Sequence, residues 1–140
     1  MNFSEFKLRV IKKYFDIEKE EDAVPVVFLG LQNNRAKLVR IPEVYLEDKD
    51  KMVAEINEIV TISNPKYIAF CAFSNVHKMD TVTNKCIESI EGISMMFEDG
   101  IDDKSYTVTF KKEDNTYKFH SDFDSSEPGT ELGGRFLRKL

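Results

Sequence analysis

Three side chains near the end of the sequence, His120, Asp122 and Asp124, alternate along a segment that we predict to be a β-strand. Alternate residues of a strand point to the same side of a sheet, so an imidazole and two carboxylates would share one face. Such ligands suit zinc, iron or manganese, and His77 could complete the shell from elsewhere in the chain. A solvated strand face gives the same pattern, because large apolar residues occupy the alternate positions. We favour this second interpretation.

The two cysteines, Cys71 and Cys86, could supply a nucleophile with His77 or His120 as the base. Cys71 lies in the most apolar run of the sequence, where a cysteine is usually buried and inert. Cys86 lies among polar residues, but no local signature of a catalytic cysteine surrounds it. A small exported domain would usually carry more disulfides. We therefore predict two reduced thiols in a cytoplasmic protein.

The last residues combine apolar and basic side chains behind a glycine-rich segment, 129–134. That segment lacks the Gly-Lys-Ser/Thr of a phosphate-binding loop and does not follow a buried strand, so we interpret it as a hinge. Phe136, Leu137 and Leu140 could then bind a partner protein or exchange between two copies of the chain. The alternative, which we favour, is that they cover the domain's own sheet.

A second basic stretch belongs to the first predicted helix, with the cations Lys7, Arg9, Lys12 and Lys13. These side chains could face an acidic partner or a phosphate backbone, although a solvated helix face is the simpler interpretation. The whole chain carries a formal net charge of −5 at pH 7, which makes nucleic acid an unfavourable partner. No apolar run approaches the ~20 residues that a bilayer requires, so we expect no membrane span.

Composition and length indicate one globular domain, 1–140, because 41% of the 140 residues are hydrophobic and 32% are charged. Helical periodicity predicts a first helix from a Ser4 cap to about Phe15 or Ile17. We expect it to stop before the acidic residues 18–22, because negative charge is unfavourable at a helix C-terminus. A second helix should begin near Asp48 and end at Asn64, just before a proline.

Strands are predicted at 24–31, 37–41, 67–73, 93–97, 105–111 and 117–123. The run 67–73 does not alternate, so it should be a central strand that is covered on both faces. In the last hairpin, we expect Tyr117, Phe119 and Phe123 to share a face. Residues 74–91 show no clear period, and 125–140 should be a loop and a tail.

The predicted fold class is α+β, with the element order α-β-β-α-β-β-β-β and a mixed, mostly antiparallel sheet. The helix between the second and third strands should be a crossover. No motif identifies a family. We expect a non-catalytic protein-binding or regulatory module without a cofactor, of a kind typical of small bacterial or phage proteins, and self-association is possible. The alternative is a metal-dependent, hydrolase-like enzyme that uses the His120, Asp122 and Asp124 face.

Overall fold

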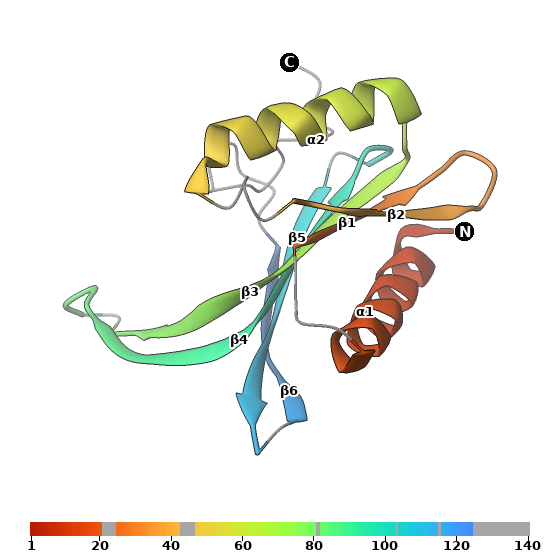
Figure 1. The fold of residues 1–140 in the computed structure, drawn as a ribbon. Helices are drawn as coiled ribbons and strands as arrows, with labels where there is room; N and C mark the ends of the chain where they lie inside the picture. Colours follow the sequence, from red (N-terminus) through yellow and green to blue (C-terminus); the bar gives the residue numbers. More distant parts are fainter. Residues whose placement is uncertain (21–24, 43–46, 81, 103, 115, 125–140) are drawn as a thin grey trace.

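The computed structural model describes residues 1–20, 25–42, 47–80, 82–102, 104–114 and 116–124, and of residues 17–20, 49, 74–79, 86–90 and 121–124 it describes only the backbone. Two helices and a six-stranded sheet follow each other in the predicted order, which confirms the α+β class (Figure 1). The elements are α1 (Phe3–Glu20), β1 (Val26–Gly30), β2 (Ala36–Arg40), α2 (Lys49–Ser63), β3 (Tyr67–Met79), β4 (Cys86–Asp99), β5 (Lys104–Glu113) and β6 (Thr116–Asp124). No helix in these residues is long and apolar enough to span a bilayer.

Every pairing in the sheet is antiparallel, so the prediction of a mixed sheet was wrong. The strand order is β2-β1-β3-β4-β5-β6. The two strands that α2 connects, β2 and β3, do run in the same direction, because each is antiparallel to β1. They are not neighbours, since β1 lies between them. The crossover is therefore present, but it passes over one strand.

Helix α1 begins earlier and ends later than predicted. Its cap is Asn2 rather than Ser4, because the Asn2 Oδ1 accepts a hydrogen bond from the Glu5 N–H at 2.8 Å. The helix continues to Glu20, into the acidic run that we expected to stop it. The dipole effect of an exposed charge is only about 0.3–1 kcal/mol, and Glu and Lys have good helix propensity, which offsets it.

Helix α2 has the caps that the sequence predicts. The Asp48 side chain accepts a hydrogen bond from the Lys51 N–H at 3.1 Å. At the other end, Asn64 adopts the left-handed conformation with φ 47°, and its N–H donates to the Val60 carbonyl. Between these caps, Met52 and Ile56 are buried in the core on one face of the sheet.

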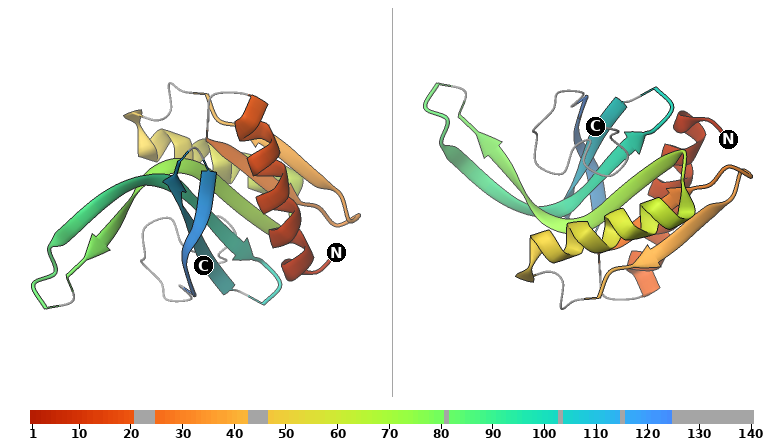
Figure 2. Two further views of the ribbon diagram at one scale, coloured as in Figure 1. Left: turned by 90° about the horizontal axis from the view of Figure 1, so that it is seen from below. Right: turned by 90° about the horizontal axis from the view of Figure 1, so that it is seen from above.

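The two helices cover opposite faces of the sheet (Figure 2). On the α1 face, the core contains Phe6, Val10 and Tyr14 of the helix together with residues of β1, β3, β4 and β5. On the α2 face, the core contains Met52 and Ile56 with residues of β1 and β3. Strand β3 contributes to both cores, Tyr67, Ala69 and Cys71 to one and Ile68 and Phe70 to the other. This confirms that the run 67–73 forms a central strand covered on both faces.

Residues 74–91, whose period was unclear, continue β3 and β4 into a long ribbon. Strand β1 pairs with β3 only as far as Cys71, and β5 pairs with β4 only from Gly92 onwards. Beyond these points, β3 and β4 pair only with each other in the described residues, and the ribbon projects from the sheet (Figure 1).

Candidate functional site

The predicted metal-ligating residues of β6 lie on an edge strand of the sheet, and the strand is irregular there. Thr109 pairs with Ser121 and the next β5 residue, Phe110, pairs with Phe119, so His120 is the extra residue of a β-bulge. A bulge interrupts the two-residue alternation that the prediction assumed. Phe123 consequently pairs with Thr107, out of phase with Phe119, and the expectation that these two aromatic residues share a face was wrong. Asp122 and Asp124 pair with Val108 and Tyr106.

The structure does not bring His77 to His120. His77 lies in the ribbon, opposite Ser89 of β4, whereas His120 is three strands away in β6. Three strand spacings amount to about 14 Å, and the two residues are also offset along the strands. Among the described residues, no group of three or more His, Cys, Asp or Glu side chains is arranged to hold a metal ion. A site formed by His120, Asp122 and Asp124 alone stays a prediction.

Cys71 is an inert core residue. Its side chain is fully buried in the core under α1. Burial raises the pKa of the thiol far above its ordinary value, because the charged thiolate would lose its hydration. Cys86 lies in β4, opposite Met79, and its side chain is outside the described residues. The tail residues Phe136, Leu137 and Leu140 are also outside them.

An open apolar groove runs between α1 and the last two strands, and we call it the α1–β6 groove. It encloses about 460 Å³. Its lining consists of Ser4, Lys7, Leu8 and Ile11 of α1, Tyr106, Val108 and Phe110 of β5, and Phe119 of β6. Two of these side chains are large, apolar and mostly exposed, since Leu8 retains 69% and Phe119 59% of their accessible surface.

The sequence did not indicate this groove. Leu8 lies in sequence between Phe6 and Val10, which are core residues. The structure turns Phe6 and Val10 toward the sheet and leaves Leu8 on the flank. Phe119 packs edge-on against Phe110, with the ring centroids 6.3 Å apart, but β6 is the last strand of the sheet and no other strand among the described residues covers its outer side.

Lys7 gives the groove a cationic border. Its Nζ lies 4.2 Å from the ring centroid of Tyr106 and 4.8 Å from that of Phe3. Both distances are within the range of a cation–π interaction, which holds the ammonium group at the groove without neutralising its charge. The groove therefore combines an apolar floor with a fixed positive charge.

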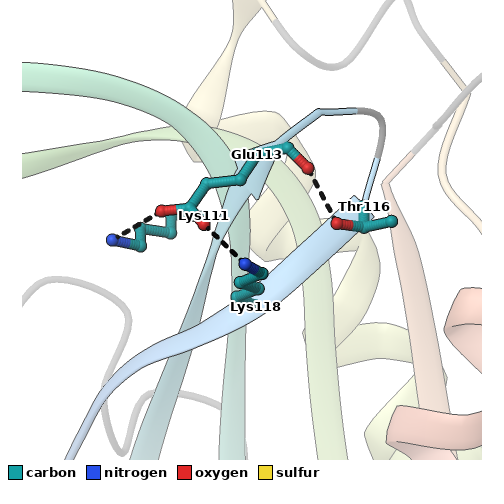
Figure 3. A network of polar contacts seen from close by, with 4 residues as sticks. All are labelled: Lys111, Glu113, Thr116 and Lys118. Carbon is teal, nitrogen blue, oxygen red and sulfur yellow. Dashed lines mark hydrogen bonds and ion pairs between the residues drawn. The ribbon is translucent and has the colours of Figure 1, made fainter.

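The turn between β5 and β6 fixes the position of the groove's outer wall. Glu113 accepts ion pairs from Lys111 at 2.8 Å and from Lys118 at 3.0 Å, and the Thr116 hydroxyl donates to the Glu113 carbonyl at 2.7 Å (Figure 3). Hydrogen bonds from Lys111 and Lys118 lower the pKa of the Glu113 carboxyl. Asp114 takes the left-handed conformation, with φ 47°, that the tight turn requires.

Comparison with models of known families, with curated proteins and with solved structures finds no match to this chain. Its function therefore has to be inferred from the chemistry of its surface.

Proposed function

We propose that this chain is a non-catalytic protein-binding module of the cytoplasm, whose α1–β6 groove takes an apolar segment of another protein. The observation that carries the proposal is the pair of exposed side chains, Leu8 and Phe119, on either side of a floor of Tyr106, Val108 and Phe110. Exposed apolar surface that forms one continuous patch is typical of interaction sites.

The openness of the groove favours a protein segment over a small molecule. A small ligand is usually enclosed over most of its surface, in a cavity whose apolar walls are themselves covered. Here the two walls are largely open to solvent, as the exposed fractions of Leu8 and Phe119 indicate. A helix or strand with two or three apolar anchors would cover both walls at once.

The charge of the groove favours an occupant that carries carboxylates next to its apolar anchors. Lys7 borders the groove, and Lys12 is exposed on the same helix. The C-terminal segment of the chain is a poorer electrostatic match, because its apolar residues alternate with Arg135, Arg138 and Lys139. Complementary charge would steer an acidic partner and exclude a basic one.

The proposal can be tested with a display library of short random peptides selected on the full chain. We expect enriched peptides with apolar anchors and acidic residues. Leu8→Glu should weaken their binding about tenfold or more, which corresponds to about 1.4 kcal/mol, because it places a charge in the anchor site. Leu8 is mostly exposed, so the variant should fold normally, as checked by circular dichroism.

The matched control is Ile62→Glu on the opposite face. Ile62 is 78% exposed at the end of α2, so the substitution makes the same chemical change on a surface outside the groove. Equal loss of binding in both variants, or no enrichment at all, would contradict the proposal. If peptide binding is lost in the double variant Phe136→Ala with Leu140→Ala, but not in Leu8→Glu, the binding site is the C-terminal tail instead. A doubled mass in light scattering that Leu8→Glu abolishes would identify a second copy as the occupant.

A further inference from the structure

Strand β2 is the other edge of the sheet, and two hydrogen bonds show which of its backbone groups are directed to β1. The Arg35 carbonyl accepts from the Leu31 N–H at 2.8 Å, and the Ile41 N–H donates to the Pro25 carbonyl at 3.0 Å. In an antiparallel pair, the N–H and C=O of one residue point to the same side, and successive residues alternate. In residues 35–41, the backbone N–H and C=O groups of the odd-numbered residues therefore point toward β1.

Two even-numbered residues, Ala36 and Leu38, consequently direct their N–H and C=O groups away from β1. Because β2 ends the strand order, no other strand in the described residues takes these groups. They form a row of donors and acceptors along one edge, which is the arrangement that an added strand recognises.

A small hollow lies directly beside this edge, between β2 and the flank of α1 that faces away from the α1–β6 groove. It encloses about 210 Å³, and its lining consists of Arg9, Val10, Lys13, Phe28, Ala36 and Leu38. Ala36 and Leu38 belong both to the hollow and to the open backbone row. The floor is apolar, and the two side chains at the helix are cations.

The surroundings of β2 are strongly basic in a chain whose net charge is −5. Arg35 and Lys37 are exposed at the edge. Arg9 and Lys13 of α1 line the hollow on the side of Leu38, whereas Lys37 lies on the other face of the strand. Arg9 Nη1 donates to the Asn34 carbonyl at 3.5 Å, an uncharged acceptor. Within the part of the chain that the structure describes, no carboxylate forms an ion pair with Lys13, Arg35 or Lys37.

We propose that the open edge of β2 takes an acidic, extended segment of a partner protein as an additional strand. An apolar side chain of that segment would lie beside Leu38 in the hollow. Since side chains alternate along an extended chain, carboxylates on one face would reach Arg9 and Lys13, and carboxylates on the other face would reach Lys37.

The charge pattern disfavours the simplest alternative, an antiparallel pairing of two β2 strands from two copies. Such a pairing would gather Arg35, Lys37 and Arg40 of both copies along one short two-stranded edge. Like charges close together on paired strands are destabilising, and edge lysines are a common means of preventing this association. The same cations favour a strand that carries acidic residues.

The probe is a fluorescent synthetic peptide with one central Val and Glu at the other positions, so that an extended chain presents carboxylates on both faces. Its binding to the full chain is measured by anisotropy. We expect Lys13→Glu and Lys37→Glu each to weaken binding about three- to tenfold, because each turns an attraction into a repulsion. Lys112→Glu is the matched control, since Lys112 is exposed on β5 and far from β2 in the strand order. The amide protons of Ala36 and Leu38 should exchange more slowly with peptide bound.

Backbone pairing is tested separately with peptides that are N-methylated on alternate nitrogens. Methylation along the edge that faces β2 should abolish binding, and methylation along the opposite edge should not. Equal binding of a peptide with Lys in place of Glu, insensitivity to methylation, or an equal effect of Lys112→Glu would overturn the proposal. Tighter binding of a single-stranded oligonucleotide of the same charge would identify a nucleic-acid site instead. Leu8→Glu should leave binding of this peptide unchanged. The proposal for the α1–β6 groove and the proposal for the β2 edge can therefore be contradicted independently.

Discussion

The chemical reactivity of a single residue in this protein depends on its burial, and Cys71 is the clearest case. We expect Cys71 in a Cys86→Ser background to resist alkylation by iodoacetamide in the native protein. Burial disfavours the thiolate that alkylation requires, and the side chain has no contact with solvent. Mass spectrometry of the treated protein measures the extent of modification.

Denaturant supplies the control for this measurement, because an unfolded chain exposes the thiol and should be alkylated rapidly. Modification at equal rates with and without denaturant would mean that Cys71 is accessible in the native state, contrary to its position under α1.

The sequence predicted the environment of single residues only where a local pattern determined it. Cys71 could be assigned to the core because its neighbours on both sides are apolar. His120 could not be placed, because a bulge depends on how β6 pairs with β5 and leaves no mark in composition. Leu8 could not be placed either, because its exposure depends on how α1 rests on strands about a hundred residues later.

At the scale of elements, the approach of α1 to the sheet depends on Gly30. A Cβ at this position would lie 3.0 Å from Tyr67 Cδ2, 3.2 Å from Tyr67 Cβ and 3.3 Å from Phe6 Cδ2. The Phe6 and Tyr67 rings are stacked with centroids 5.5 Å apart, so they form a close layer over the glycine. We expect Gly30→Ala to lower the free energy of unfolding by about 1–3 kcal/mol through overpacking.

Urea unfolding followed by circular dichroism checks this prediction. Phe6→Leu in the same chain should recover part of the loss, because it removes one of the crowded rings, and the double-mutant cycle measures the coupling. If Gly30→Ala leaves the urea midpoint unchanged or raises it, α1 can move away from the added methyl group without a loss of stability.

Element types were predictable, but element partners were not. The start of α2 at Asp48 and its end at Asn64 are encoded within a few residues, and both were found as predicted. The insertion of β1 between β2 and β3 is a pairing across some forty residues, for example Val26 with Cys71. No local pattern specifies that choice, so the sequence favoured a parallel neighbour that does not occur.

At the scale of the molecule, the two cores are not independent, because β1 and β3 contribute side chains to both. We therefore expect that a destabilising substitution in one core unfolds both faces together. Ile56→Ala truncates a fully buried side chain of α2 and should lower the free energy of unfolding by about 2–5 kcal/mol. The tyrosine fluorescence and circular dichroism transitions should stay coincident, as in a two-state domain.

The control for this variant lies on the same helix. Ile62→Ala alters an exposed residue and should change stability by about 0.5 kcal/mol or less. Separate transitions for the two probes in Ile56→Ala would show that the α1 face can remain folded alone.

The packing of α1 also has a consequence for synthesis on the ribosome. Helix α1 leaves the ribosome long before the strands on which it rests, since Phe15 packs against Phe110 with ring centroids 5.0 Å apart. At about 5–20 residues per second, the 95 positions from Phe15 to Phe110 take about 5 to 20 s to translate. During that interval, Phe6, Val10 and Tyr14 have no sheet to cover them, so the nascent chain presents an apolar helix to which chaperones can bind.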